Sequence, residues 1–577
     1  MEWKAQYEKW KSKLNLDASI AEELKKSEGN ESLLEDSFYK TLEFGTGGMR
    51  GEIGPGTNRM NIYTIRKGAQ GLADFIAEAG EEAKKKGVVI AYDNRRMSKE
   101  FSLETALTLG ANGVKTYLFK ELRPTPELSY AVRRLGTFSG VMVTASHNPP
   151  EYNGFKAYGE DGAQLIPEDA DRLIEKVNAV EDELEVKTAE ADDLEKQGLL
   201  EWVLEDIDEA YIKEMESITL DRKLIEEHGS NLSIVFTPLH GTATVPMQRS
   251  LKNAGFTNVH TVTEQAVPDT EFSTVRSPNP EEADAFELAV KLGNEKNADL
   301  LIATDPDADR IGLVVRNDQG EFTVLSGNQT GALLLDYLLT KKQEKQELPD
   351  NGIVIKTIVT SELGREIAES FGMSTLDVLT GFKFIGEKIR EYETTKAHTF
   401  LFGYEESYGY LIEPFARDKD AIQPAVLAAE MTAFYKSKGM TLYEGLQNLY
   451  KKYGFFYEDL ASFTFKGKEG AEKIQRIMNV FRDSVEQGEL PDNVTFVEDY
   501  LRSTRTFMDG RDKEKIDLPQ SNVLKLFLND GSWYCLRPSG TEPKIKCYFG
   551  VNGKTSEEAS SKLMEVKKEV LAKLEAI

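Results

Sequence analysis

The sequence predicts an α/β protein built from several domains. Its 577 residues are enough for about three to five domains of ordinary size. Six short runs rich in Val, Ile and Leu are each followed by a polar or glycine-rich loop and then by a helix-like segment. Continuous apolar runs are typical of buried parallel strands, and their alternation with helices predicts βαβ units. The six runs with their loops lie at 88–98, 140–149, 233–242, 299–310, 353–363 and 399–409.

Changes in this pattern divide the chain into four predicted domains. The N-terminal segment MEWKAQYEKWKSKLNL predicts a charged amphipathic helix. The acidic stretch 181–206 indicates the end of the first domain, and a new helix begins near residue 327. After about residue 450 the alternation gives way to a hairpin-like pair of strands and a final helix from about residue 555, which predicts an α+β unit. The predicted domains are 1–208, 209–324, 325–452 and 453–577, of which the first three are α/β.

Composition argues against several functional classes. With 71 basic and 98 acidic residues the formal charge is −27, which argues against non-specific nucleic-acid binding and against docking on anionic membranes. No segment approaches the about 18 apolar residues of a membrane span, and the N-terminus does not have the pattern of a signal peptide. The two cysteines, Cys535 and Cys547, are expected to be free core thiols. These features predict a cytoplasmic protein, and five scattered histidines argue against zinc.

A serine and a histidine stand side by side in VMVTASHNPPEYNGFKAYGEDG, residues 141–162, where a predicted strand opens into a loop. A catalytic triad needs a histidine nitrogen within hydrogen-bond reach of the serine oxygen. Adjacent residues on a strand point to opposite faces, so His147 is expected to be badly placed as a base for Ser146. The G-x-S-x-G elbow is also missing, and a serine hydrolase is therefore not expected. Taken alone, the loop also fits a turn whose serine caps the chain before Pro149.

Three aspartates alternate in TDPDADR, directly after the apolar run 300–303. If the loop stays extended, this spacing brings Asp305, Asp307 and Asp309 to one side. Three neighbouring carboxylates repel one another unless a cation lies between them, and hard oxygen ligands favour Mg²⁺ or Ca²⁺. The loop lacks the glycine and the final glutamate of an EF-hand. Arg310 indicates an anion nearby, and the alternative is a plain acidic turn.

Two further loops carry polar groups suited to a phosphosugar. The segment LRPSGTEPK offers a guanidinium, two hydroxyls and backbone N–H groups that fit a phosphate, at Arg537, Ser539, Gly540 and Thr541. An ordinary turn is the alternative. The segment GYEESYG offers Glu405 and Ser407 beside aromatic residues, a combination that suits sugar hydroxyls but is a weak signal alone.

In this order along the chain, TASHNP, DPDADR, GYEESYG and RPSGTEP resemble the α-D-phosphohexomutase superfamily, and most closely its phosphoglucomutases. The segments FGTGGMRG (44–51) and TGFKFIG (380–386) fit as well, whereas the first 40 residues carry no motif. The resemblance implies three related α/β domains and a smaller C-terminal α+β domain around a central cleft. At Gly47, Tyr404 and Ala421 the chain departs from the motifs frequent in this superfamily. Because no charged group is lost, these departures put the substrate preference in doubt more than the chemistry.

The resemblance also implies a role for each matching residue. Ser146 would carry the transferable phosphoryl group, and a phosphoserine oxygen would join the three aspartates around Mg²⁺. The residues implied around the phosphoserine are Arg50, His147, Lys156 and Arg310. The residues implied to bind the substrate are Lys383 and Lys419 near its phosphate, Glu405 and Ser407 at its hydroxyls, and Arg537, Ser539, Gly540 and Thr541 at the phosphate that does not react.

The implied activity is interconversion of glucose 1-phosphate and glucose 6-phosphate, with glucose 1,6-bisphosphate as intermediate and activator. Phosphoryl transfer depends mainly on positioning and charge neutralisation, and either Lys156 or His147 would accept the hydroxyl proton. Mannose and pentose phosphates are alternative substrates for the same chemistry. A Mg²⁺-dependent sugar phosphatase and a phosphosugar sensor are alternatives from other classes. The expected ligands are small sugar phosphates, with no nucleic acid and no membrane, and the sequence predicts no particular oligomeric state.

Overall fold

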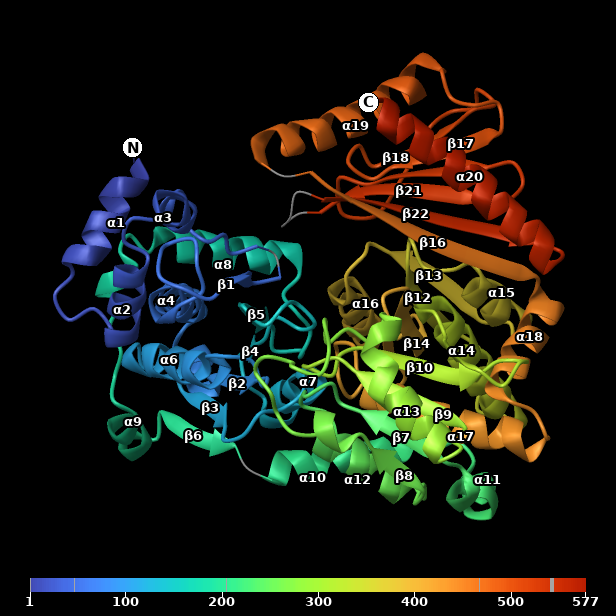
Figure 1. Cartoon of the computed structure of the whole chain (residues 1–577), viewed down its shortest axis with the longest axis horizontal. Helices are drawn as coiled ribbons and strands as arrows, with labels where there is room; N and C mark the ends of the chain where they lie inside the picture. The colour runs from blue at the N-terminus through green and yellow to red at the C-terminus, as the bar shows by residue number, and fades with distance from the viewer. Residues whose placement is uncertain (1, 46, 204, 466, 540–543) are drawn as a thin grey trace. The chain divides into compact units, whose positions relative to one another are not determined.

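The computed structural model describes residues 2–45, 47–203, 205–465, 467–539 and 544–577 (Figure 1). The chain forms two compact units. The first comprises Met1–Gly327, Phe382–Gly403 and Ser407–Leu442, and the second comprises Asn328–Gly381, Tyr404–Glu406 and Tyr443–Ile577. No helix of the described ranges is long and apolar enough to cross a membrane.

The first unit contains a six-stranded sheet in the order β1-β5-β4-β2-β3-β6. Strand β2 is parallel to β3 and β4, as predicted, whereas β5 is antiparallel to β4. Helix α4 packs against both α6 and α8, and α7 packs on β2 and β4. The strands are β1 (Met49–Glu52), β2 (Val88–Tyr92), β3 (Thr116–Phe119), β4 (Ser139–Val143), β5 (Tyr152–Tyr158) and β6 (Leu200–Val203). The helices are α4 (Ile62–Ala79), α5 (Glu81–Lys86), α6 (Ser98–Ala111), α7 (Thr125–Leu135), α8 (Pro167–Ala179) and α9 (Ala191–Gln197).

The same unit contains a five-stranded sheet in the order β11-β10-β9-β7-β8. Its parallel strands β8, β7 and β9 are joined by an antiparallel β10. The strands are β7 (Ile234–Thr237), β8 (Val259–Thr261), β9 (Leu300–Thr304), β10 (Ile311–Arg316) and β11 (Phe322–Val324). The helices are α10 (Glu205–Glu214), α11 (Arg222–His228), α12 (Thr244–Ala254), α13 (Glu287–Glu295), α16 (Phe382–Thr395) and α17 (Ile422–Ser437). Helix α17 is buried on nearly all sides, as expected of a helix that is apolar all round.

The N-terminal segment forms three helices, α1 (Glu2–Ser12), α2 (Ala18–Lys26) and α3 (Glu31–Phe38), so the predicted first helix is confirmed. These helices share an aromatic cluster with the start of α4, in which Trp10 packs edge-on against Phe38 and Tyr63. The indole N–H of Trp10 donates a buried hydrogen bond of 2.8 Å to Glu183. The first 40 residues, which carry no motif, are therefore packed against the start of α4 and bonded to Glu183.

In the second unit, seven strands form an antiparallel sheet in the order β16-β22-β21-β20-β17-β18-β19. Helices α19 and α20 both contribute side chains to its single core, which confirms the predicted α+β domain. Within the described residues, Cys535 and Cys547 are buried free thiols, as expected. The strands are β16 (Phe455–Thr464), β17 (Val494–Asp499), β18 (Thr504–Phe507), β19 (Glu514–Lys515), β20 (Leu524–Leu528), β21 (Trp533–Pro538) and β22 (Lys544–Gly553), and the helices are α19 (Gly467–Gln487) and α20 (Ser556–Ala576).

A further sheet has the order β13-β12-β14-β15, in which β12 and β13 are parallel. Its strands are β12 (Gly352–Thr357), β13 (Ser374–Val378), β14 (Thr399–Glu405) and β15 (Gly409–Leu411). The helices around it in the sequence are α14 (Gly327–Glu344), α15 (Leu363–Ser370) and α18 (Leu442–Tyr453).

All six predicted strands are present, but the helix expected after each loop is found only after β2, β7 and β12. After β4, β9 and β14 the chain continues into another strand instead. For β4 and β9 that next strand, β5 or β10, is antiparallel to its predecessor. The apolar spacing of these short segments was mistaken for a helical pattern, an ambiguity common to short apolar runs. Each of these three loops carries one of the motifs singled out in the sequence.

Candidate active site

The serine loop, residues 144–151, joins β4 to β5. The Ser146 hydroxyl lies 2.5 Å from Asp305 Oδ2 and 3.2 Å from His147 Nδ1. The expectation that Ser146 and His147 point to opposite faces was therefore wrong. Strand β4 ends at Val143, and Ser146 has a φ of 52°, so the alternation of an extended strand does not apply to this pair.

The serine loop is held by Arg95, whose side chain is completely buried. Its guanidinium donates hydrogen bonds to four carbonyl oxygens in and beside the loop, those of Ser146, Asn148, Pro149 and Tyr152. The bond to Pro149 is 2.8 Å long and that to Tyr152 is 3.1 Å. A planar fork with five donors can satisfy four acceptors in a way that no other side chain can.

A second set of contacts orients Ser146 through its backbone. The Ser146 N–H donates to the Thr144 hydroxyl at 2.8 Å, and that hydroxyl donates to Asp93 Oδ2 at 2.6 Å. Asp93 is buried and also accepts the N–H of Arg95 at 2.9 Å. The strand and loop at 88–98 were predicted from the sequence, but Asp93 and Arg95 were not identified as functional residues. Their position could have identified them, because they directly follow β2, which pairs with β4, and ligands bind at the carboxyl ends of neighbouring parallel strands.

Arg95→Lys is expected to lower kcat by about 10–100-fold, because one ammonium cannot reach four carbonyls and a small misplacement of the serine loop is costly. The matched control is Arg96→Lys. The neighbouring Arg96 is half exposed and pairs with Glu271, so its replacement should leave turnover nearly unchanged. Steady-state kinetics and thermal unfolding of both variants make the comparison. Equal effects of the two changes would contradict the role of Arg95.

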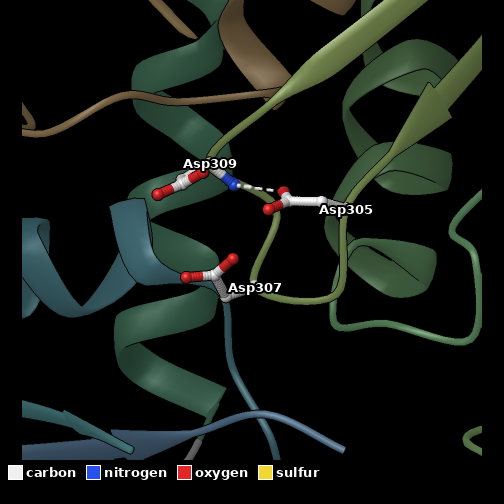
Figure 2. A group of neighbouring side chains, drawn as sticks. All are labelled: Asp305, Asp307 and Asp309. Carbon is white, nitrogen blue, oxygen red and sulfur yellow. Dashed lines mark hydrogen bonds between the residues drawn. The ribbon is translucent and has the colours of Figure 1, made fainter. Parts of the chain in front are cut away.

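The aspartate loop, residues 305–310, joins β9 to β10 and presents three buried carboxylates that face one another (Figure 2). One oxygen from each of Asp305, Asp307 and Asp309 lies within 4.8 Å of the others. The loop is a turn and not the extended segment that was expected. Ala308 has a φ of 54°, and Asp305 Oδ1 accepts the N–H of Asp309 at 3.1 Å. The carboxylates converge because the chain curls around Asp305.

These carboxylates fit a divalent cation. Among the described residues, Asp307 Oδ1 and Asp309 Oδ1 are buried and accept no hydrogen bond. Burial and the charges of the other two aspartates raise the pKa of Asp305 well above its ordinary value. Hard anionic oxygens that are buried without donors are the ligands that Mg²⁺ and Ca²⁺ prefer. Asp307 is further oriented by Thr125, which no motif of the sequence indicated and whose N–H and hydroxyl donate to it at 2.9 Å each.

Cationic side chains surround the aspartate loop within the first unit. Lys156 Nζ lies 2.8 Å from Asp307 Oδ2, and Lys419 Nζ lies 3.0 Å from Asp309 Oδ2. Arg310 forms an ion pair with Glu281. Burial alone would lower the pKa of Lys156, but Asp307 and Asp309 outweigh burial and raise that pKa. Charged lysines next to a cation site offer a place for a phosphate.

Two predicted residues lie at the edge of this group. Arg50 is exposed and donates a 3.1 Å hydrogen bond to the Asn148 side chain of the serine loop. Lys383 lies near the start of α16, where the ring of Phe382 is 5.9 Å from Lys419 Nζ. The structure thus collects most of the predicted phosphoserine and metal residues around Ser146.

Strand β14 ends with a buried carboxylate. Glu405 Oε1 accepts the N–H of Gly381 at 2.9 Å. Its neighbour Tyr404, considered a departure that bears on substrate preference, is a core residue. A Cβ added at Gly331 or Gly364 would come within 2.5 Å or 2.0 Å of Tyr404 atoms, so these glycines make room for its ring. Tyr404 is therefore a packing residue, which removes one reason to doubt the substrate.

The predicted phosphate cradle lies between β21 and β22 in the sequence. Arg537 is part of β21, and the N–H of Ser539 donates to the Lys544 carbonyl at 2.8 Å. Gly540 and Thr541 lie outside the described residues. Ser407, in the loop between β14 and β15, is half-buried.

Comparison with known proteins identifies the family. A phosphoglucomutase of Staphylococcus haemolyticus is 39% identical over 91% of this chain and 93% of its own length. One of Staphylococcus epidermidis is 39% identical over 93% of this chain and 95% of its own. The chain also matches the alpha/beta/alpha domains I, II and III and the C-terminal domain of phosphoglucomutase/phosphomannomutase, at residues 41–184, 209–320, 326–453 and 467–570.

The chain belongs to the phosphoglucomutase/phosphomannomutase family. Membership in this family confirms the resemblance seen in the sequence and the predicted class of three α/β domains and a C-terminal α+β domain. Solved structures of lower identity share the fold. A putative phosphomannomutase of Thermus thermophilus has a TM-score of 0.66 at 21% identity, covering 92% of this chain and 99% of that one. The phosphoglucomutase parafusin of Paramecium has a TM-score of 0.69 at 19% identity, covering 93% and 95%.

Proposed function

We propose that this protein is a phosphoglucomutase that interconverts glucose 1-phosphate and glucose 6-phosphate. The observation that carries the proposal is the contact of 2.5 Å between the Ser146 hydroxyl and Asp305, at a buried group of three carboxylates. Relatives named phosphoglucomutase that span more than nine-tenths of the chain support glucose as the sugar. The protein acts on small sugar phosphates in the cytoplasm and binds neither nucleic acid nor membranes, in keeping with its charge of −27.

In the proposed cycle Ser146 enters as a phosphoserine. The phosphorus–oxygen bond to Ser146 breaks as a new one forms to a free hydroxyl of the sugar phosphate, giving glucose 1,6-bisphosphate. The hydroxyl proton passes to a basic side chain, for which His147 and Lys156 are the two candidates. His147 is the better of them, because its Nδ1 lies 3.2 Å from the Ser146 hydroxyl, whereas Asp307 and Asp309 hold Lys156 in its charged form. The bisphosphate reorients, and its other phosphate returns to Ser146, which leaves the isomeric monophosphate. Added glucose 1,6-bisphosphate activates the enzyme by restoring the phosphoserine.

Asp305, Asp307 and Asp309 would hold Mg²⁺ together with an oxygen of the phosphoserine. The buried carboxylate oxygens without hydrogen-bond donors support this assignment within the described part of the chain. When bound, the ion supplies positive charge that stabilises the transferring phosphoryl group. The protein adds its own cations, since Arg50 bonds to Asn148 of the serine loop, Arg310 directly follows Asp309, and Lys156 and Lys419 already pair with Asp307 and Asp309.

Substrate recognition is assigned to the remaining predicted residues. Glu405 and Ser407 accept or donate hydrogen bonds to sugar hydroxyls, and Lys383 and Lys419 neutralise the substrate phosphate. The phosphate that does not react is held by Arg537, Ser539, Gly540 and Thr541. A side-by-side measurement of kcat/KM with glucose, mannose, glucosamine and ribose 1-phosphates tests the sugar. A preference for mannose or ribose 1-phosphate over glucose 1-phosphate would replace glucose in the proposal.

Arg537→Ala is expected to weaken substrate binding by about 10–150-fold, because a charge-assisted contact worth roughly 1.5–3 kcal/mol is lost. The bisphosphate should also escape more often, so turnover should depend more on added glucose 1,6-bisphosphate. The control is Arg511→Ala, which removes an exposed arginine paired with Asp509 in the same domain. ³¹P NMR follows both isomers and free phosphate. Stoichiometric free phosphate without isomerisation by the unmodified protein would identify a phosphatase and overturn the proposal.

A further inference from the structure

A pocket of about 390 Å³ lies in the first unit, apart from Ser146 and the three aspartates. Its walls come from the segment before α7 and the first turn of α7, from α10 and from the start of α12, and α10 packs against both α7 and α12. Most of its lining is apolar, from Leu122, Ile212, Val245, Pro246, Ala266 and Pro268. A largely apolar pocket of this volume with a few polar groups is typical of a small-molecule site.

The polar end of the pocket contains a buried acceptor that lacks a donor. Arg123 donates two hydrogen bonds, of 2.8 and 2.7 Å, to Asp208. Glu127 is only 1% exposed, and its Oε1 accepts no hydrogen bond from the described residues. The nearest guanidinium nitrogen of Arg123 is 3.8 Å from this oxygen, too far for a hydrogen bond. Buried side-chain acceptors are nearly always satisfied, so an N–H or O–H is missing here.

The charge state of this end favours an uncharged occupant. Burial and the hydrogen bond with Asp208 raise the pKa of Glu127 well above its ordinary value, which favours its uncharged form. Arg123 and Asp208 already neutralise one another. The rim is also apolar, because Val245 is 56% exposed and Val267, next to two lining residues, is 64% exposed.

The segments that line the pocket also hold the aspartate loop. On one wall, two residues before Glu127, Thr125 donates its N–H and its hydroxyl to Asp307, both at 2.9 Å. On the other wall, Thr242 donates its N–H and its hydroxyl to the Pro306 carbonyl at 2.9 and 3.0 Å. A Cβ at Gly241 would lie 2.5 Å from Pro306, so this wall packs directly on the loop. A shift of either wall therefore moves the aspartates.

We propose that this pocket is a second ligand site, which binds an uncharged, mostly apolar molecule carrying one N–H or O–H donor and changes the rate of phosphoryl transfer through Thr125 and Thr242. The donor bonds to Glu127 Oε1, and the apolar body packs between α12 and the segment 266–268. The effect on rate rests on the proposed mutase function, whereas the binding itself does not.

Two probes of the same shape test the site, indole with an N–H donor and benzofuran without one. Indole is expected to bind the full-length protein at millimolar concentration or better, as its size allows, and about tenfold more tightly than benzofuran. Glu127→Gln keeps a carbonyl oxygen and should keep this preference. Glu127→Met removes the acceptor and should make the two probes bind alike. Saturation-transfer NMR and calorimetry measure binding without any turnover.

Two variants should exclude both probes by filling the pocket, Ala266→Phe inside it and the exposed Val245→Trp at its mouth. Thermal unfolding establishes that each variant is folded. If Ala266→Phe does not fold, Val245→Trp alone provides the test. Undiminished indole binding by the folded variants, or no binding to the unmodified protein, would overturn the site. Indole should alter kcat for glucose 1-phosphate in the unmodified protein only. Binding without a change in kcat of an active mutase would overturn the coupling, and binding to a protein without mutase activity would refute the proposed function while leaving the site intact.

Discussion

Ser146→Ala is expected to lower kcat by at least about 10³-fold, the scale expected when a covalent route is removed. The hydroxyl of Ser146 is the group that lies against both Asp305 and His147, and alanine can accept no phosphoryl group. The active protein should carry one phosphate, on Ser146. Conversion of glucose 1-phosphate to glucose 6-phosphate, intact mass and phosphopeptide mapping provide the measurements.

The matched control for this change is Ser217→Ala, which removes the hydroxyl of an exposed serine in the same unit, one that bonds only locally to the Glu214 carbonyl among the contacts described. It should leave both kcat and the phosphate content unchanged. Full activity of Ser146→Ala, or a phosphate mapped to another residue of the active protein, would rule out the phosphoserine mechanism.

Asp307→Asn is expected to lower kcat by at least about 10²-fold and to raise the Mg²⁺ concentration needed for activity. Even the loss of a residue that only hydrogen-bonds to a metal ligand lowers metal affinity or activity by about 10–100-fold. Asparagine keeps a side-chain oxygen for the hydrogen bond from the Thr125 hydroxyl but loses the negative charge that faces Lys156 at 2.8 Å. Activity of the unmodified protein should vanish on chelation and return with Mg²⁺. Calcium should support turnover poorly, because its looser coordination positions the phosphoryl group less well.

Asp318→Asn, in the exposed turn after β10, is the control and should keep the original Mg²⁺ dependence. Circular dichroism and thermal unfolding of the variants separate loss of the site from loss of the fold. Undiminished turnover in excess chelator, with no metal found by elemental analysis, would contradict a metal at these aspartates.

Much of the fold could be predicted because continuous apolar runs in the sequence correspond to buried strands. The run 88–92 is buried at every position, and all six predicted strands formed. The same runs did not reveal which element comes after each strand. A segment such as Tyr152–Tyr158 mixes apolar and polar residues over only seven positions, and its pairing with β4 is a contact between chain segments that local spacing does not encode.

The sequence by itself determined the family and predicted most side chains of the candidate site, because the charged and hydroxyl groups of each motif are close neighbours in the chain. Only the tertiary structure decided how they are held. The turn around Asp305, the left-handed backbone of Ser146 and the four carbonyls bound by Arg95 all depend on contacts across loops. Arg95 lies 51 residues before Ser146, and Thr125 lies 182 residues before Asp307. Such pairs meet only when β2, β3, β4 and β9 place the segments that follow them together, since hydrogen bonding and charge pairing act over a few ångströms in space and not along the sequence.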